Sequence, residues 1–139
     1  MKRTILIALI LLLGWNLFPT HADEAAEKAA TAAAPAWLSQ IDAGSYANSW
    51  RDASAYFKGA VTENGFRDAV ARARKPLGKL LSRKLSKAQS ATSLPGAPDG
   101  NYVVMQFDSS FASKKSAVET VTFMQEKDGK WKAAGYYIK

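Results

Sequence analysis

The hydrophobic pattern of this chain changes its period near Lys79, and this change limits the folds available to it. Before Lys79, apolar residues recur at steps of three and four, which is typical of amphipathic helices. After Lys79 they alternate, as in strands with one buried face. Helical segments followed by consecutive strands indicate an α+β fold, in which N-terminal helices pack on a sheet.

Turn signals divide the second part of the chain into four strands. They are Pro95-Gly96, Pro98-Asp99-Gly100-Asn101, Ser113-Lys114-Lys115 and Asp128-Gly129. The strands they predict cover residues 80–92, 101–112, 117–126 and 130–139. Consecutive hairpins of this kind build a four-stranded antiparallel meander.

The second of these strands shows which side of the sheet the helices cover. One side of it is apolar, with Val103, Met105, Phe107 and Phe111. The other side is mixed, with Tyr102, Val104, Gln106, Asp108 and Ser110. We expect the apolar side to receive the helices, because burial of apolar surface drives packing.

Three helices are expected before the sheet. The first runs from Pro35 to a stop at Gly44. Ser45 is expected to cap the second, which carries Tyr46, Trp50 and Phe57 and ends at Gly59. The third covers residues 64–75, with apolar Phe66, Ala69, Val70 and Ala73. Residues 23–34 are rich in alanine and have little to bury, so we interpret them as an arm outside the single domain of residues 35–139.

The first 22 residues have the three parts of an export signal. Lys2 and Arg3 precede an apolar stretch, and small side chains at Thr20 and Ala22 suit a signal peptidase. Gly14 and Asn16 interrupt the apolar run before it reaches the roughly 20 residues that span a bilayer. We therefore expect cleavage after Ala22 and a periplasmic or secreted protein without a transmembrane segment.

Composition narrows the chemistry of the mature chain. It has no cysteine, and its only histidine, His21, lies in the predicted signal. These are the side chains that most often serve as nucleophiles, general bases and metal ligands. We therefore expect no metal, no cofactor and no histidine-based or cysteine-based catalysis.

Basic residues concentrate between Arg67 and Lys87, where Asp68 is the only acidic residue. They define an expected basic face, made of Arg67, Arg72, Lys75, Lys79, Lys84 and Lys87. Such a face either binds anionic lipid or glycan at the cell envelope or only aids solubility. No aromatic-interleaved basic motif points to nucleic acid.

Glu119 is the most informative single residue, because alternation places it on the same side as Val121 and Phe123. A buried carboxylate needs a cationic partner, and Arg83 and Arg74 are the expected ones. These residues either line a pocket for a polar ligand, with Tyr46 and Tyr136 as further candidates, or form a structural ion pair.

Other candidates carry weaker signals. Asp42, Tyr46 and Trp50 are spaced for one helical face, but Gly44 interrupts that helix, so we expect core anchors and a turn cap at Asp42. Asp108, with Tyr102 and Gln106, forms either a polar lining or an exposed sheet face. Trp131 is expected to pack, and Tyr136 and Tyr137 to point to opposite faces of the last strand.

Several short motifs together resemble the bacterial family called domain of unknown function 4019. They are Trp37-Leu38, Asp42-x-Gly44-x-Tyr46-x3-Trp50, Arg74-x-Pro76-Leu77-Gly78-x4-Arg83, Leu94-Pro95-Gly96-x-Pro98-x-Gly100-x-Tyr102-Val103, Glu119-Thr120 and Asp128-Gly129-x-Trp131-x3-Gly135-Tyr136. The resemblance implies a small secreted domain of the nuclear-transport-factor-two-like or cystatin-like group, whose helices pack on a curved sheet. It implies no reaction, and catalytic members of the wider group commonly use a histidine that this mature chain lacks.

These observations lead to one main functional expectation. We expect a non-catalytic domain that binds a small or anionic ligand through a pocket or through the basic face. Electrostatic docking to an anionic envelope surface is the first alternative. An enzyme that uses Asp108 or Glu119 with a tyrosine is the second.

Overall fold

A computed structural model describes residues 23–139, and the predicted export signal lies outside them. Within residues 23–139, four α-helices come first: α1 (Glu24–Asp42), α2 (Tyr46–Arg51), α3 (Ala55–Ala60) and α4 (Glu63–Arg74). A 3₁₀ turn, η1 (Lys75–Leu77), leads to four strands: β1 (Leu80–Ala91), β2 (Tyr102–Phe111), β3 (Lys114–Gln125) and β4 (Trp131–Ile138). None of the described helices is long and apolar enough to cross a membrane.

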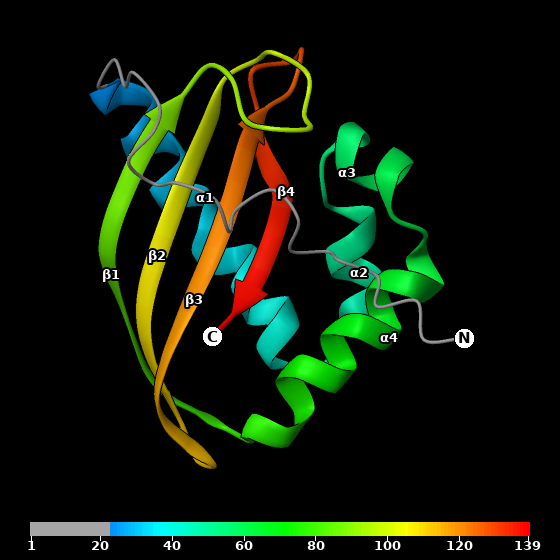
Figure 1. Cartoon of the computed structure of the whole chain (residues 1–139), viewed down its shortest axis with the longest axis vertical. Helices are drawn as coiled ribbons and strands as arrows, with labels where there is room; N and C mark the ends of the chain where they lie inside the picture. The colour runs from blue at the N-terminus through cyan, green and yellow to red at the C-terminus, as the bar shows by residue number, and fades with distance from the viewer. Residues whose placement is uncertain (1–22) are drawn as a thin grey trace.

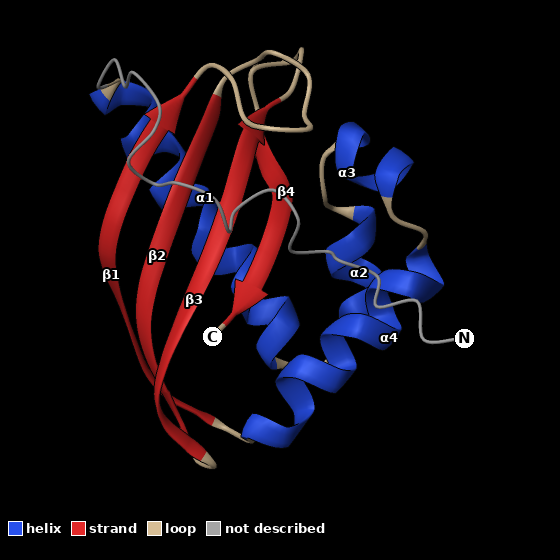
Figure 2. Ribbon diagram, viewed as in Figure 1, coloured by secondary structure: helices blue, strands red, loops and turns tan. Residues whose placement is uncertain are grey.

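The sheet is the predicted antiparallel meander, with strand order β1-β2-β3-β4. α1 crosses one face of the sheet and contacts all four strands, while α2, α3 and α4 gather beyond β4 (Figure 1). Figure 2 shows the same separation of helices and strands. The predicted α+β class and the order of its elements are therefore confirmed. β3 begins three residues earlier than expected, because the turn before it consists only of Ala112 and Ser113.

The expected start of the first helix at Pro35 was wrong. α1 begins at Glu24, and the Asp23 carboxylate caps it by accepting the Ala26 N–H at 2.9 Å. Residues 24–34 are therefore part of the helix that crosses the sheet, and Ala30 and Ala34 are fully buried, at 0% exposure. The sequence prediction failed because alanine has little apolar area to bury. Its small side chain nevertheless suits a helix that lies close against strands.

A pair of contacts fastens the first turn of α1 to the sheet. The backbone N–H of Asp23 donates to Ser90 Oγ at 2.8 Å, and the Ser90 N–H donates to Glu27 Oε1 at 3.2 Å. Ser90 lies at the end of the edge strand β1. The alanine-rich segment is thus held both by burial and by polar contacts at its beginning.

The expected second helix is divided into α2 and α3. Ser45 makes no side-chain cap bond, whereas the Ser54 hydroxyl accepts the Phe57 N–H at 3.1 Å and starts α3. The Ser54 N–H also donates to the Ala133 carbonyl at 2.8 Å, so the break between the helices contacts β4. Hydroxyl caps of this kind compete with helix continuation, which explains the division. α4 follows the prediction within one residue at each end, and Thr62 caps it.

The core forms where the helices meet the apolar side of β2 and β3. Trp37 lies at its centre, with ring centroids 5.6 Å from Tyr136, 6.2 Å from Phe123 and 6.4 Å from Phe66. The expected inward residues Val103, Met105 and Phe107 belong to this cluster. A second small cluster on the other face joins Leu94 of the β1–β2 loop to Tyr102 and Val104.

The buried position of Ala34 gives a test of the revised helix. Ala34→Leu should lower the free energy of unfolding by about 1–3 kcal/mol, because extra methylene groups overpack a close helix–sheet contact. Ala32 is exposed on the same helix. Ala32→Leu should therefore change stability by less than about 0.5 kcal/mol in urea denaturation. Equal losses for the two variants would contradict this packing.

Candidate functional site

The structure gathers most of the predicted site residues in one buried polar cluster, which we call the Glu119 cluster. Its members come from six elements: Asp42 (α1), Arg74 (α4), Arg83 (β1), Ser109 (β2), Glu119 (β3) and Tyr136 (β4). The cluster therefore joins the helical layer to every strand of the sheet.

Glu119 is fully buried, at 0% exposure, and both its carboxylate oxygens are occupied. Oε1 accepts from Arg83 Nε at 2.7 Å and from Ser109 Oγ at 2.6 Å. Oε2 accepts from Arg83 Nη2 at 3.1 Å and from the Tyr136 hydroxyl. Four donors around one carboxylate provide the compensation that a buried charge requires. The predicted pairing of Glu119 with Arg83 is present.

Arg83 bridges two carboxylates. Besides Glu119, it donates to Asp42 Oδ2 at 2.8 Å and to Asp42 Oδ1 at 2.9 Å. Burial disfavours the charged guanidinium, but hydrogen bonds and charge interactions with Asp42 and Glu119 outweigh burial and raise the pKa of Arg83. Four donor contacts use most of the five N–H groups of this side chain.

The expected contact between Arg74 and Glu119 was wrong. Arg74 instead donates to Asp42 Oδ1 at 3.3 and 3.4 Å, and to the carbonyl oxygen of Gly78. Its guanidinium lies over the Phe111 ring, 4.4 Å from the centroid. At the end of α4, Arg74 is 4% exposed and completes the same network through Asp42.

The expected turn cap at Asp42 was also wrong, because its carboxylate binds the two arginines. Asp42 is the most accessible charged member, with a side chain 19% exposed. Tyr46 lies nearby, and its pKa is raised by burial and lowered in part by Arg74. Trp50 instead donates its indole N–H to the Val61 carbonyl at 2.8 Å, so Asp42, Tyr46 and Trp50 do not act as one unit.

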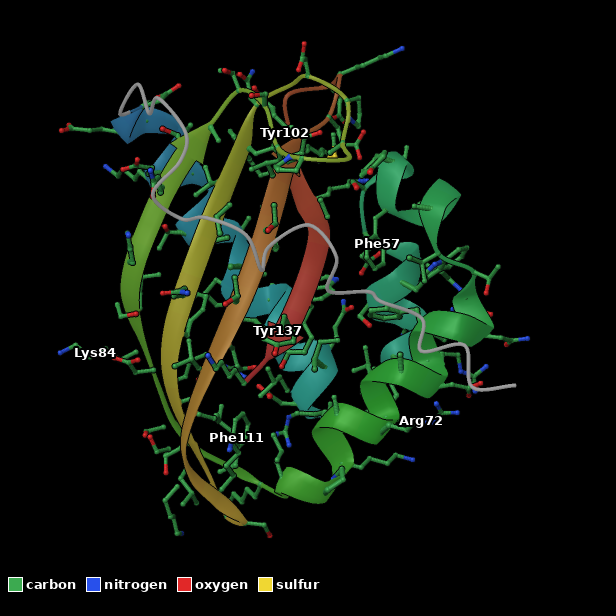
Figure 3. The ribbon with its side chains drawn as sticks, viewed as in Figure 1. Phe57, Arg72, Lys84, Tyr102, Phe111 and Tyr137 are labelled. Atoms are coloured by element: carbon green, nitrogen blue, oxygen red, sulfur yellow. The ribbon has the colours of Figure 1, made fainter. Side chains whose placement is uncertain are left out.

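Tyr136 is a hydrogen-bond donor in this cluster. Burial raises its pKa well above the usual 10.0, and the negative charge of Glu119 raises it further. The phenol is therefore neutral at physiological pH and donates to Glu119. Tyr136 and Tyr137 lie on opposite faces of β4, as expected, and the structure shows that Tyr136 is the one on the core side, while Tyr137 lies on the other face (Figure 3).

The six residues of the expected basic face do not lie together. Arg67, Arg72 and Lys75 are exposed on or next to α4, whereas Lys84 and Lys87 are on β1. Figure 3 shows Arg72 and Lys84 pointing away from opposite sides of the molecule. Lys79 lies just before β1, between the two groups along the chain.

The structure also shows where the candidates with weaker sequence signals lie. Asp108 is exposed on the outer side of β2, opposite Lys84 of β1 in the strand register. The Tyr102 hydroxyl donates to the Pro98 carbonyl at 2.5 Å. Tyr102 therefore packs in the second small cluster, with Leu94 and Val104, and does not form a polar lining with Asp108. Within residues 23–139, no three His, Cys, Asp or Glu side chains are placed to hold a metal ion.

A groove that the sequence interpretation missed lies between α1 and the start of β4. It encloses about 240 Å³, and Trp37, Phe123 and Trp131 are among its lining residues. Gln40 and Asp52 line it from the helical side, and Lys130 and Lys132 from the β4 side. We call it the Trp131 groove. The sequence pattern predicts only a packing role for Trp131, because the two walls of the groove come from segments far apart in the chain.

The polar groups of the Trp131 groove are incompletely paired. Gln40 Nε2 donates to Asp52 Oδ2 at 2.8 Å, which fixes the orientation of the amide because a carboxylate only accepts. Gln40 Oε1 is then a buried acceptor without a partner in residues 23–139. An unpaired buried acceptor is uncommon and calls for a donor.

The comparison with protein families identifies the chain's relatives. The model of DUF4019, described as a protein of unknown function, matches residues 33–136, well over half of the chain. The chain belongs to the DUF4019 family. This DUF4019 match contains every member of the Glu119 cluster and the lining of the Trp131 groove. Among curated proteins, no match was found.

Removal of Arg83 tests how the cluster contributes to stability. Arg83→Met should cost about 3–5 kcal/mol of unfolding free energy, because it leaves the buried Glu119 carboxylate without its cation. Arg72→Met, at an exposed position, is the matched control and should change stability by less than about 0.5 kcal/mol. Adding Glu119→Leu to Arg83→Met should recover part of the loss, as measured by urea denaturation. Similar effects for the two single arginine variants would contradict a structural role for the cluster.

The raised pKa of Tyr136 predicts a loss of stability in alkali. Above pH 10 the unfolded chain loses the phenol proton while the folded chain keeps it, so unfolding becomes more favourable as pH rises. One such group contributes about 1.4 kcal/mol per pH unit. Tyr136→Phe should therefore be less stable at pH 8, and its stability should fall less steeply between pH 10 and 11.5. Parallel pH profiles for the two proteins would contradict this assignment.

Proposed function

We propose that this DUF4019 member is an exported, non-catalytic domain that binds a small ligand in the Trp131 groove. The observation that carries the proposal is the composition of that groove: Trp37, Phe123 and Trp131 line it together with Asp52 and two lysines that make no ion pair within residues 23–139. Small-molecule sites typically combine an apolar lining with a few polar groups that fix orientation.

The Glu119 cluster is a poor ligand site, although it holds four of the predicted ligand-binding candidates. Two arginines face two carboxylates, and most of their donors and acceptors are already used within the cluster. An incoming anion would have to displace Asp42 or Glu119 from Arg83 and leave a carboxylate unpaired. The cluster supports the proposal indirectly, because it fixes α1 and the strands that form the groove.

The environment of Glu119 also argues for a non-catalytic role. A general base must reach the proton it removes and have a free lone pair. Glu119 has no exposed surface and accepts four hydrogen bonds, and the phenol of Tyr136 is held in its neutral form. Asp108 is exposed on the outer face without a tyrosine in hydrogen-bond contact within the described residues.

Electrostatic docking has less support than groove binding. Arg72 of α4 and Lys84 of β1 point away from opposite sides of the molecule (Figure 3), so a flat anionic surface would not contact both at once. The attraction of three or four exposed charges is weak at physiological salt. Groove binding needs only the residues that already line one concavity.

Export is the part of the proposal that rests on sequence alone. The charged start, the apolar stretch and the small residues before Asp23 carry it. Mass spectrometry of the protein recovered from its native cells should give a chain that begins at Asp23. A chain with an intact Met1 in the cytosol would contradict export without affecting the groove.

A thermal-shift screen against small acids, sugars and aromatic compounds tests groove binding. A ligand at about 100 times its dissociation constant adds about 2.7 kcal/mol of stability, which raises the Tm by several degrees in a domain of this size. The gain should disappear in Trp131→Ala, with each shift measured from that variant's own Tm. Tyr137→Ala is the matched control, because Tyr137 lies on the same strand but outside the groove lining.

Two results would reject the proposal. One is a screen in which no compound raises the Tm of the wild-type protein. The other is a compound whose stabilisation survives in Trp131→Ala, because that compound binds elsewhere.

A further inference from the structure

The backbone nitrogen of Asp23, the residue that follows the predicted cleavage position, lies against the edge strand of the sheet. It donates to Ser90 Oγ at 2.8 Å. Ser90 is in turn bound to Glu27, whose Oε1 accepts the Ser90 N–H at 3.2 Å and the Ser90 hydroxyl at 3.4 Å. Figure 1 shows the start of α1 beside the end of β1. A buried serine, 5% exposed, therefore joins the nitrogen of Asp23 to a carboxylate.

Cleavage after Ala22 changes the chemistry of this nitrogen. A signal peptidase adds one water molecule across the Ala22–Asp23 peptide bond. Ala22 then leaves as a carboxylate, and the nitrogen of Asp23 becomes an ammonium group with three N–H donors in place of one. Such a group has an ordinary pKa of about 7.7–8.0, so it is mostly charged at neutral pH. The export proposed above, on which this step rests, therefore puts a positive charge where the precursor has a neutral amide.

The Glu27 carboxylate is close enough to favour that charge. Asp23 N and Glu27 Oε1 both bind Ser90 Oγ, so they are at most 6.2 Å apart, the sum of the distances of 2.8 and 3.4 Å. An opposite charge within about 4–6 Å stabilises the charged form of an amine. Glu27 is half-buried, which limits the screening of this attraction by salt.

The end of a helix by itself disfavours a cation, because the partial charge there is positive. In α1 three carboxylates offset this effect. Glu24 and Glu27 lie in the first turn, and the Asp23 carboxylate accepts the Ala26 N–H at 2.9 Å. Lys28, which is exposed, follows one residue after Glu27. The charge of residues 23–28 is therefore negative before cleavage, and an ammonium at Asp23 reduces it.

The structure also has room for the two additional N–H groups. A cavity of about 120 Å³, the space of about four water molecules, lies beside Asp23, Ala26 and Ser90. The other described residues of its lining are Ala91, Thr92, Asn101 and Tyr102. None of these side chains is a cation. Burial raises the pKa of Tyr102, so its phenol is neutral at physiological pH.

We infer that Ser90 and Glu27 form the binding site of the N-terminal ammonium group of the mature chain. The ammonium donates to Ser90 Oγ, and the Glu27 carboxylate supplies the opposite charge. The site attaches the first turn of α1 to β1, whereas Asp42 attaches the other end of α1 to Arg83. Cleavage thus completes the attachment of the helix that lines one side of the Trp131 groove.

The experiment compares two forms of the mature protein, one that begins at Asp23 and one with a single glycine added before Asp23. The added residue moves the ammonium by about 3–4 Å and returns the Asp23 nitrogen to a neutral amide. Amide hydrogen exchange at Glu27 and Ala30 reports the local stability of the first turns of α1. We expect about threefold higher protection in the chain that begins at Asp23, at pH 7 and low salt, and a smaller difference as salt rises.

The pKa of the terminal amine gives a second readout, followed by NMR at the Asp23 Cα signal. In the chain that begins at Asp23 it should lie about half a pH unit above its ordinary value, which is a threefold change in proton affinity. The stabilisation should be present below the ordinary pKa and disappear as pH rises through the raised pKa, because a neutral amine is not attracted to Glu27.

Two variants identify the carboxylate. Glu27→Gln keeps an acceptor for the Ser90 N–H but removes the charge, so it should abolish the difference between the two chains and return the amine pKa towards its ordinary value. Glu24→Gln is the matched control, because Glu24 lies in the same turn but is exposed. It should leave most of the difference in place.

The outcomes separate the ammonium site from the proposed function. Equal protection in the two chains would overturn the ammonium site and leave export and groove binding untouched. A difference that persists in Glu27→Gln would also overturn it. If the protein recovered from its native cells begins at another residue, the predicted cleavage position is wrong, and the ammonium site is rejected with it.

Discussion

The buried carboxylate of Glu119 is the constraint on which the arrangement of this domain depends. A charge without exposed surface must be surrounded by donors, and Glu119 takes them from three different strands. Arg83 then brings in Asp42, and Asp42 brings in Arg74, so the ends of α1 and α4 are fixed against the sheet. Any relative shift of these elements would leave part of this network unpaired inside the protein. Such a network confers a single arrangement more than it adds net stability.

The aromatic core and the ion network hold α1 at neighbouring points. Trp37 packs on Tyr136, and the hydroxyl group of Tyr136 donates to Glu119. The same tyrosine therefore joins apolar packing to the charged cluster. Trp37 also lines the Trp131 groove, together with other residues of α1 and with the start of β4. A groove with walls fixed in this way needs little reorganisation to bind a ligand, which favours affinity in a small site.

The contrast between the two polar regions explains their different roles. In the Glu119 cluster, charges balance and the lone pairs of the central carboxylate are used. The Trp131 groove is lined by Lys130 and Lys132, which make no ion pair in the described part of the chain, and by Gln40, whose side-chain carbonyl oxygen has no hydrogen-bond partner there. Polar groups that satisfy one another fix the arrangement of the fold, whereas lysines without ion pairs remain available to a ligand.

The sequence by itself determined the class of fold, the order of the strands and the need of Glu119 for an arginine partner, with Arg83 and Arg74 as the candidates. Alternation showed which face of β3 is buried, and a buried carboxylate requires a cation. Local information was therefore enough to predict that Glu119 pairs with an arginine. Tertiary structure alone decided that residues 24–34 pack on the sheet, that Arg74 binds Asp42 and not Glu119, and that Arg72 and Lys84 point away from each other. Each of these depends on distances between segments far apart in the chain. The Trp131 groove belongs to the same group, because its two walls meet only when α1 lies across the sheet.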